Sequence, residues 1–156
     1  MSPLKLPKMD ENEIKQVLQN EKLCRIAFID DKYPYISPFQ YVYLNDTMYF
    51  HFTDYGKKKK ILEKNTNVCV SIEHLQEDLS AFSFISMQGK LVLVADEGEK
   101  LTVLKHMVKI ARNTYSQNFL TAHGFEKEKG WEVIKNKSEL IYKFVEMREP
   151  IGLKSP

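Results

Sequence analysis

Short strand-like runs separated by turn residues constrain the fold of this chain more than any other feature of its sequence. Turn residues separate the first three runs: Asp30-Asp31-Lys32 in one case and Asn45-Asp46-Thr47 in the other. A spacing of roughly ten residues between turns is typical of antiparallel hairpins, which predict a small barrel rather than a parallel sheet. The runs expected to form strands, six in all, are Leu23–Ile29, Tyr35–Leu44, Met48–Phe52, Asn67–Ile72, Ala81–Ala95 and Glu139–Glu149.

Helices are expected around this barrel. Asp10 with Glu13 three residues later forms a capping-box pattern and predicts a short helix that ends near Asn20. Asp96 is expected to cap a longer helix that starts at Glu97. The predicted fold class is therefore mainly β with peripheral helices.

Length and composition indicate an ordinary globular chain. At 156 residues, with 43% hydrophobic and 28% charged residues, residues 1–156 are expected to form a single domain with one core. A net charge of +2 gives no indication of a nucleic-acid partner. Cys24 and Cys69 lie in apolar runs and are expected to be free thiols in a reducing compartment. Without a membrane-spanning run or a signal peptide, the expected location is cytoplasmic, with no membrane contact.

The stretch from His51 to Leu62 predicts a site for phosphate. A strand ends there, and the chain passes through Thr53 and Gly56 into four consecutive lysines with helical character, Lys57 to Lys60. The first N–H groups of a helix lack partners within the helix, and they attract anions. Lysines in a first turn oppose the helix dipole, whereas a bound phosphate would reverse that cost. The alternatives are that the lysines form a solvated face and that His51 is a strand histidine bonded to backbone.

Three segments resemble a known superfamily when they are taken in order. The first is the strand that starts at Pro34-Tyr35 and continues through Pro38 to Tyr43, and the second has the pattern H-x-x-x-x-G-x-K at His51, Gly56 and Lys58. The third is Ser86-Met87-Gln88-Gly89-Lys90-Leu91. Together they resemble the pyridoxamine 5′-phosphate oxidase-like, FMN-binding split-barrel superfamily, nearest to the nitroimidazole-resistance flavoproteins. The resemblance implies a six-stranded antiparallel split β-barrel of the FMN-binding type.

The resemblance also implies FMN as the cofactor and assigns residues to it. Its ring is expected along the second strand and its phosphate near the lysines, and the family's homodimers hold the flavin between subunits. Ser86 and Gln88 would replace a polar residue that the family often carries where this chain has Phe84. The implied cofactor-binding residues are Gln40, Tyr41 and Val42 for the ring, Thr53, Lys58 and Lys57 for the phosphate, and His51, Ser86, Gln88 and Trp131, the last covering the flavin from the partner subunit.

The implied function is an FMN-dependent oxidoreductase that passes electrons or hydride from a reduced nicotinamide to a small-molecule acceptor. The sequence has no Ser–His–Asp order, CxxC pair, Walker loop or zinc spacing, which fits chemistry carried by a cofactor, and no catalytic side chain is assigned. Family signatures for vitamin B6 oxidation are not recognisable around Trp131 or Arg148, so that activity is not expected. The alternatives are a flavin-holding sensor without turnover, a haem or deazaflavin (F420) protein on the same barrel, and a nucleic-acid binder that uses the lysines, which the small net charge disfavours.

Overall fold

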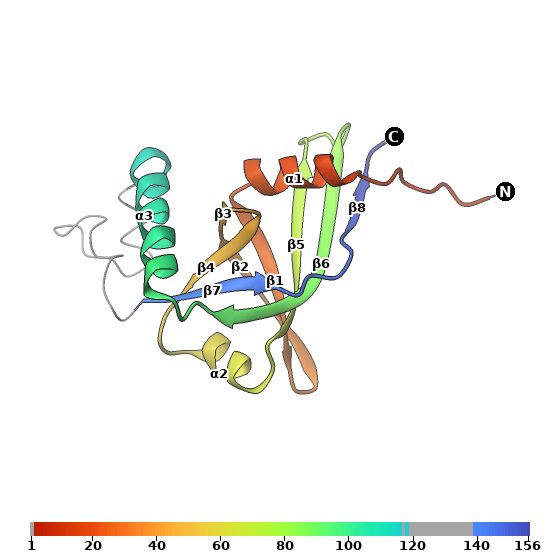
Figure 1. The fold of residues 1–156 in the computed structure, drawn as a ribbon. Coiled ribbons are helices and arrows are strands. Elements are labelled where there is room, and N and C mark those ends of the chain that lie inside the picture. The colour runs from red at the N-terminus through yellow and green to blue at the C-terminus, as the bar shows by residue number, and fades with distance from the viewer. Residues whose placement is uncertain (1, 117, 119–138) are drawn as a thin grey trace.

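The computed structural model describes residues 2–116, 118 and 139–156, which form eight strands and three helices (Figure 1). The strands are β1 (Leu23–Asp30), β2 (Tyr33–Gln40), β3 (Val42–Leu44), β4 (Thr47–Phe52), β5 (Asn67–Leu75), β6 (Phe82–Leu93), β7 (Leu140–Val145) and β8 (Ile151–Lys154). The helices are α1 (Glu11–Asn20), α2 (Lys57–Lys64) and α3 (Glu97–Thr114). The predicted fold class, mainly β with peripheral helices, is confirmed.

The strands form one antiparallel sheet that curves into an open barrel. Their order is β2-β1-β5-β6-β7-β4-β3, and β8 pairs with β6 outside this path. β6 is long enough to pair with β5 and β8 through its first part and with β7 through its last part. Figure 1 shows α1 and α2 at opposite ends of the curved sheet, with α3 to one side.

The predicted count of six strands was too low, because one expected strand divides into β2 and β3 and because β8 lies beyond Glu149, where the last expected strand ended. The second run breaks at Tyr41, whose N–H donates to the Lys22 carbonyl at 3.3 Å and whose hydroxyl donates to the Leu18 carbonyl at 2.8 Å. These tertiary bonds take Tyr41 out of the ladder, so β2 pairs with β1 while β3 pairs with β4. The last run ends near Glu146, which has a positive φ of 51°.

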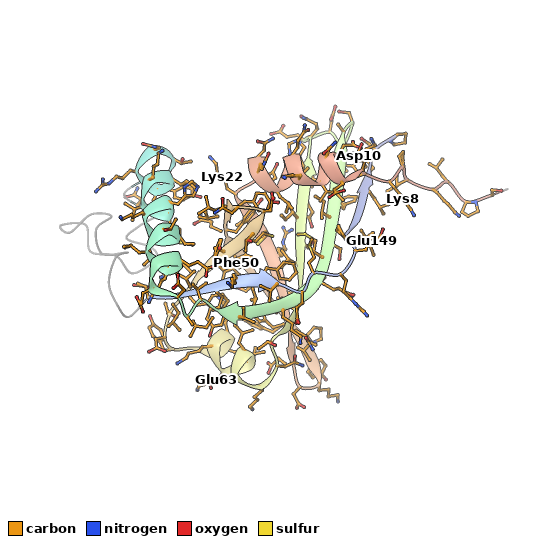
Figure 2. The ribbon with its side chains drawn as sticks, in the orientation of Figure 1. Lys8, Asp10, Lys22, Phe50, Glu63 and Glu149 are labelled. Carbon is orange, nitrogen blue, oxygen red and sulfur yellow. The ribbon has the colours of Figure 1, made fainter. Side chains whose placement is uncertain are left out.

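Aromatic and aliphatic side chains from alternate strand positions fill the barrel. Phe50 is fully buried among the strands, as Figure 2 shows, and its ring lies 5.9 Å from that of Phe39. Gly89 lies where β6 passes close to β7: a Cβ there would be 2.7 Å from the Phe144 ring and 2.8 Å from the Val145 carbonyl. No side chain fits at this crossing, which explains the glycine in the middle of β6.

Different interactions hold α1 and α3 in place. The predicted capping box of α1 is confirmed, because Glu13 N–H donates to the Asp10 carboxylate at 2.8 Å and Asp10 N–H donates to the Glu13 carboxylate at 3.1 Å. α3 packs over β4 and β7 through a second, smaller apolar cluster that includes Tyr49, Val103 and Ile141.

Among the helices of the described residues, none is both long and apolar enough to cross a membrane.

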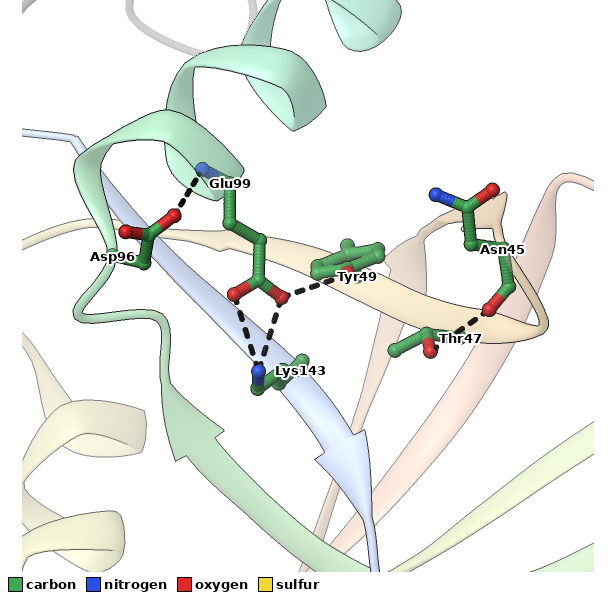
Figure 3. Close-up of polar contacts among 6 residues, drawn as sticks. All are labelled: Asn45, Thr47, Tyr49, Asp96, Glu99 and Lys143. Carbon is green, nitrogen blue, oxygen red and sulfur yellow. Dashed lines mark hydrogen bonds and ion pairs between the residues drawn. The ribbon is translucent and has the colours of Figure 1, made fainter.

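A polar cluster also ties α3 to the sheet (Figure 3). The Glu99 carboxylate accepts a hydrogen bond from the Tyr49 hydroxyl at 2.9 Å and two from the Lys143 ammonium at 3.0 and 3.2 Å. Glu99 N–H donates to the capping Asp96 carboxylate at 2.8 Å. The bonds from Lys143 and then Tyr49 hold the pKa of Glu99 below its usual value, whereas burial and Glu99 raise the pKa of Tyr49 to about 12. The helix start is thus joined to both β4 and β7.

Candidate functional site

An open cleft of about 470 Å³ lies where the ends of β2 and β4 meet the start of α2. Its lining combines two lysines at the helix start, which form a cationic end, with apolar and aromatic side chains. We call it the lysine cleft. Its lining residues are Leu23, Tyr35, Pro38, Phe39, Gln40, His51, Phe52, Thr53, Tyr55, Gly56, Lys57 and Lys58.

The start of α2 is without a capping side chain. Gly56 occupies the N-cap position with a positive φ of 98°, a conformation that glycine adopts without strain, and within the described residues no side chain caps the helix by a hydrogen bond. The first turn contains no acidic residue. The positive end of the helix dipole therefore lies at the lysine cleft, and no carboxylate of the described residues lines that cleft.

The four lysines of α2 differ in their partners. Lys57 pairs with Asp30 at 3.2 Å, and its ammonium lies 4.6 Å from the centre of the Tyr35 ring. Lys59 pairs with Asp54, and with Glu63 at 3.8 Å. Lys60 is exposed to solvent.

Lys58 is the lysine that enters the cleft without a carboxylate. Its ammonium lies 4.7 Å from the centre of the Phe39 ring, and no carboxylate of the described residues pairs with it. Burial lowers the pKa of Lys58, because desolvation disfavours the charged form. A partly buried cation without an anionic partner is costly unless a ligand supplies the negative charge.

Thr53 and His51 line the same cleft. The Thr53 hydroxyl donates to the Tyr55 carbonyl at 3.0 Å and so shapes the loop before α2. His51 Nε2 contacts the carboxylate of Glu139, which precedes β7, while His51 itself pairs with Ile141 in the ladder. A carboxylate in contact with one ring nitrogen fixes the orientation of an imidazole.

The predicted ring contacts lie in different environments. Gln40 lines the lysine cleft, whereas the side chains of Tyr41 and Val42 are buried. The N–H of Tyr41 already donates to the Lys22 carbonyl. Of these three residues, Gln40 is therefore the one that the structure places at the cleft.

The remaining predicted residues lie away from the cleft. Gln88 lines a second hollow of about 560 Å³, which we call the arginine hollow after Arg148 in its wall. The Ser86 hydroxyl lies 3.3 Å from the Cys69 sulfur on the same outward face of the sheet. Trp131 lies outside the described residues. The structure thus gathers Gln40, His51, Thr53, Lys57 and Lys58, and separates Ser86 and Gln88 from them.

Sequence reasoning did not anticipate several neighbours of the lysines and of His51. Tyr35 and Phe39, which lie under Lys57 and Lys58, are four residues apart and share the inward face of β2. Alternation along the strand could have indicated that shared face. The contacts of Asp30 with Lys57 and of Glu139 with His51 join distant segments, so no local pattern signals them.

The arrangement fits an anionic group that is joined to a flat apolar body. The cationic end offers an ammonium and helix N–H groups, and the other end offers Leu23, Pro38 and the Gln40 amide. Within the described part of the chain, no group of three or more His, Cys, Asp or Glu side chains could hold a metal ion. The geometry therefore supports binding of a phosphate-bearing organic ligand.

Comparisons with known proteins give a family and a fold. The family model described as "Pyridoxamine 5′-phosphate oxidase" matches residues 10–134. A search of curated protein sequences gave no match.

Solved structures share the fold at low sequence identity. An FAD-binding protein from Mesorhizobium loti has a TM-score of 0.67 at 17% identity, with 98% of this chain and 100% of that chain covered. A NimC/NimA family protein from Clostridium acetobutylicum has a TM-score of 0.59 at 13% identity, with 92% and 90% covered. The haem storage protein HutZ from Vibrio cholerae has a TM-score of 0.63 at 16% identity, with 92% and 94% covered. At such identities the likeness shows a common fold.

Proposed function

This chain belongs to the pyridoxamine 5′-phosphate oxidase family, and on that premise we propose that it is a flavoprotein that binds FMN in the lysine cleft. The phosphate occupies the cationic end, between Lys58, the start of α2 and the Thr53 hydroxyl. The isoalloxazine ring occupies the end lined by Leu23, Pro38 and Gln40. The residues of the cleft have the chemistry that each part of FMN needs.

The unpaired charge of Lys58 is the observation that carries this proposal. A cation in the first turn of a helix costs about 0.3–1 kcal/mol against the helix dipole. Burial adds to that cost, as the lowered pKa of Lys58 indicates. A phosphate dianion offsets both costs at once, because it pairs with the ammonium and accepts bonds from the helix N–H groups.

The proposed activity is electron transfer between small molecules. When bound, FMN supplies hydride and electron transfer through its ring. The chain's own residues then bind and orient it: Lys58 holds the phosphate, while Gln40 contacts the ring and Glu139 orients His51 at the cleft wall. Among the described residues that line the cleft there is no serine or cysteine nucleophile. We propose that a reduced nicotinamide donates the hydride and that a small organic molecule accepts it.

A homodimer with the flavin between the subunits completes this proposal. The outward face of β1 and β2 carries Leu23, Ile29 and Ile36, each at least half exposed. The lysine cleft extends from Leu23 and Gln40 to Tyr35, which pairs with Phe28 in the wall of the arginine hollow. We propose that this apolar face of one subunit packs against the same face of a second copy across a two-fold axis, next to both lysine clefts.

Identification of the cofactor tests the function. The full chain is purified, its visible absorption spectrum is recorded, and the small molecule released by denaturation is identified by mass. Flavin absorbance with release of FMN is expected. A haem spectrum, release of F420, or failure of added flavin to bind the protein would contradict the proposal. Reoxidation of the reduced protein by small acceptors then separates an enzyme from a sensor that only holds flavin.

A further inference from the structure

We propose that Asp30 and Asp54 make the lysine cleft selective for a flavin with a terminal phosphate, FMN, over the dinucleotide FAD, an inference that rests on the proposed flavin binding. They do so by neutralising the lysines on either side of Lys58. The selectivity therefore comes from two residues that pair with the lysines but are not among the residues that line the cleft.

The two aspartates come from different elements and reach opposite sides of Lys58. Asp30 ends β1 and pairs with Lys57 at 3.2 Å, whereas Asp54 lies in the loop before α2 and pairs with Lys59. Successive residues of a helix are about 100° apart around its axis, so Lys57 and Lys59 flank Lys58. Each flanking cation thus already has a carboxylate within the chain.

The charge that remains at the cleft suits one phosphate monoester. Lys58 contributes a full positive charge, and the start of α2 contributes roughly half a charge more. The terminal phosphate of FMN carries about −1.5 to −2 charges at neutral pH, which this seat can neutralise. The flanking pairs add little net charge, because each lysine is matched by an aspartate.

FAD would bind the same phosphate site with lower affinity than FMN. Its inner phosphate is a diester with a single charge, so it loses part of the attraction to Lys58. Its second phosphate continues outward from Lys58, and the lysines that flank Lys58, Lys57 and Lys59, already pair with carboxylates. One unit of charge at 4 Å in a water-like medium changes affinity by about fivefold. We therefore expect FMN to bind at least that much more tightly than FAD.

Titration of the full-length apoprotein with riboflavin, FMN and FAD, followed by flavin fluorescence, tests this inference. The wild-type chain is compared with Asp30→Asn, Asp54→Asn and the double variant. Loss of both carboxylates frees Lys57 and Lys59 for a second phosphate, so the preference for FMN over FAD is expected to fall to within about twofold. Asp46→Asn is the matched control, because it removes an equal charge, paired with Lys15 at 2.8 Å, in the turn between β3 and β4. That variant is expected to keep the wild-type preference.

The outcomes separate the inference from the function on which it rests. Equal affinity of the wild-type chain for FMN and FAD, or a preference that the double variant keeps, would overturn the role of the aspartates and leave flavin binding standing. If none of the three flavins binds, flavin binding and the inference both fail. If the double variant does not fold, the two single variants test the inference instead, since each is expected to reduce the preference for FMN over FAD in part.

Discussion

Two charged side chains of this molecule, Glu99 and Lys58, have opposite surroundings. The Glu99 carboxylate accepts bonds from Tyr49 and from Lys143, so its charge is fully matched inside the chain (Figure 3). Lys58 lies over the Phe39 ring and has no carboxylate partner among the described residues. Removal of one partner from an internally matched pair is expected to destabilise the fold, whereas an unmatched charge in a cleft marks a candidate ligand site.

Substitution of Glu99 should lower the stability of the fold without a large loss of flavin affinity. Glu99→Gln leaves the Lys143 ammonium without its anion, and we expect the free energy of unfolding to fall by about 2–3 kcal/mol. Chemical denaturation measures this loss. The matched control is Glu97→Gln in the same helix turn, where the carboxylate is exposed, and it should change stability little. A large loss of flavin affinity in folded Glu99→Gln protein would contradict the contrast between Glu99 and Lys58.

The acid dependence of stability should follow the same cluster. Lys143 and Tyr49 hold the pKa of Glu99 below its ordinary value of 4.5. A carboxyl group with a lowered folded pKa stabilises the fold fully above its unfolded pKa, and this contribution disappears as the pH falls through the folded pKa. Below pH 4.5 the wild-type chain should therefore lose stability more steeply than Glu99→Gln. Equally steep acid unfolding curves would show that Glu99 does not contribute.

Loss of the Tyr49 hydroxyl should have a smaller effect. Tyr49→Phe removes one hydrogen bond to Glu99 and leaves the ion pair with Lys143 in place. We expect a loss of about 1 kcal/mol in the free energy of unfolding. Thermal unfolding at neutral pH checks it. If the double variant with Glu99→Gln loses as much as the two single variants added together, the two side chains do not act as one cluster.

The smallest effect on the free energy of unfolding is expected from Lys58→Met. Unlike the substitutions at Glu99 and Tyr49, it should stabilise the flavin-free chain. Lys58→Met removes an unmatched charge from the first turn of α2, so the flavin-free chain should gain about 0.3–1 kcal/mol in stability. Addition of FMN should reverse the order, because only the wild-type chain gains the bond to phosphate. Lys60→Met serves as the exposed control. A ligand-free chain that is destabilised by Lys58→Met would mean that Lys58 has a structural role.

Local sequence patterns predicted the parts of the fold that depend on neighbours in the chain. The capping box of Asp10 and Glu13 and the strand runs follow from spacing alone. The strand count was wrong for two reasons: Tyr41 leaves its ladder for tertiary bonds to Leu18 and Lys22, and β8 forms by pairing with the distant β6.

The candidate site could be predicted only in part for the same reason. The motif at His51, Gly56 and Lys58 selected one segment, and the structure gathers those residues in one cleft. Of the two cleft lysines, Lys57 has a carboxylate partner among the described residues and Lys58 has none, and this difference depends on Asp30, which lies 27 residues before Lys57 in the chain. No helical or strand periodicity connects residues so far apart.

The affinity of Lys58→Ala for FMN and for riboflavin tests the central claim most directly, with Lys60→Ala as the matched control in the same helix. If the unmatched ammonium of Lys58 binds the phosphate, Lys58→Ala should lose about 1–3 kcal/mol of FMN affinity. Its affinity for riboflavin, which lacks the phosphate, should stay at the wild-type value, and Lys60→Ala should bind both flavins as the wild-type chain does. Unchanged FMN affinity in Lys58→Ala, or an equal loss for both flavins, would contradict the account.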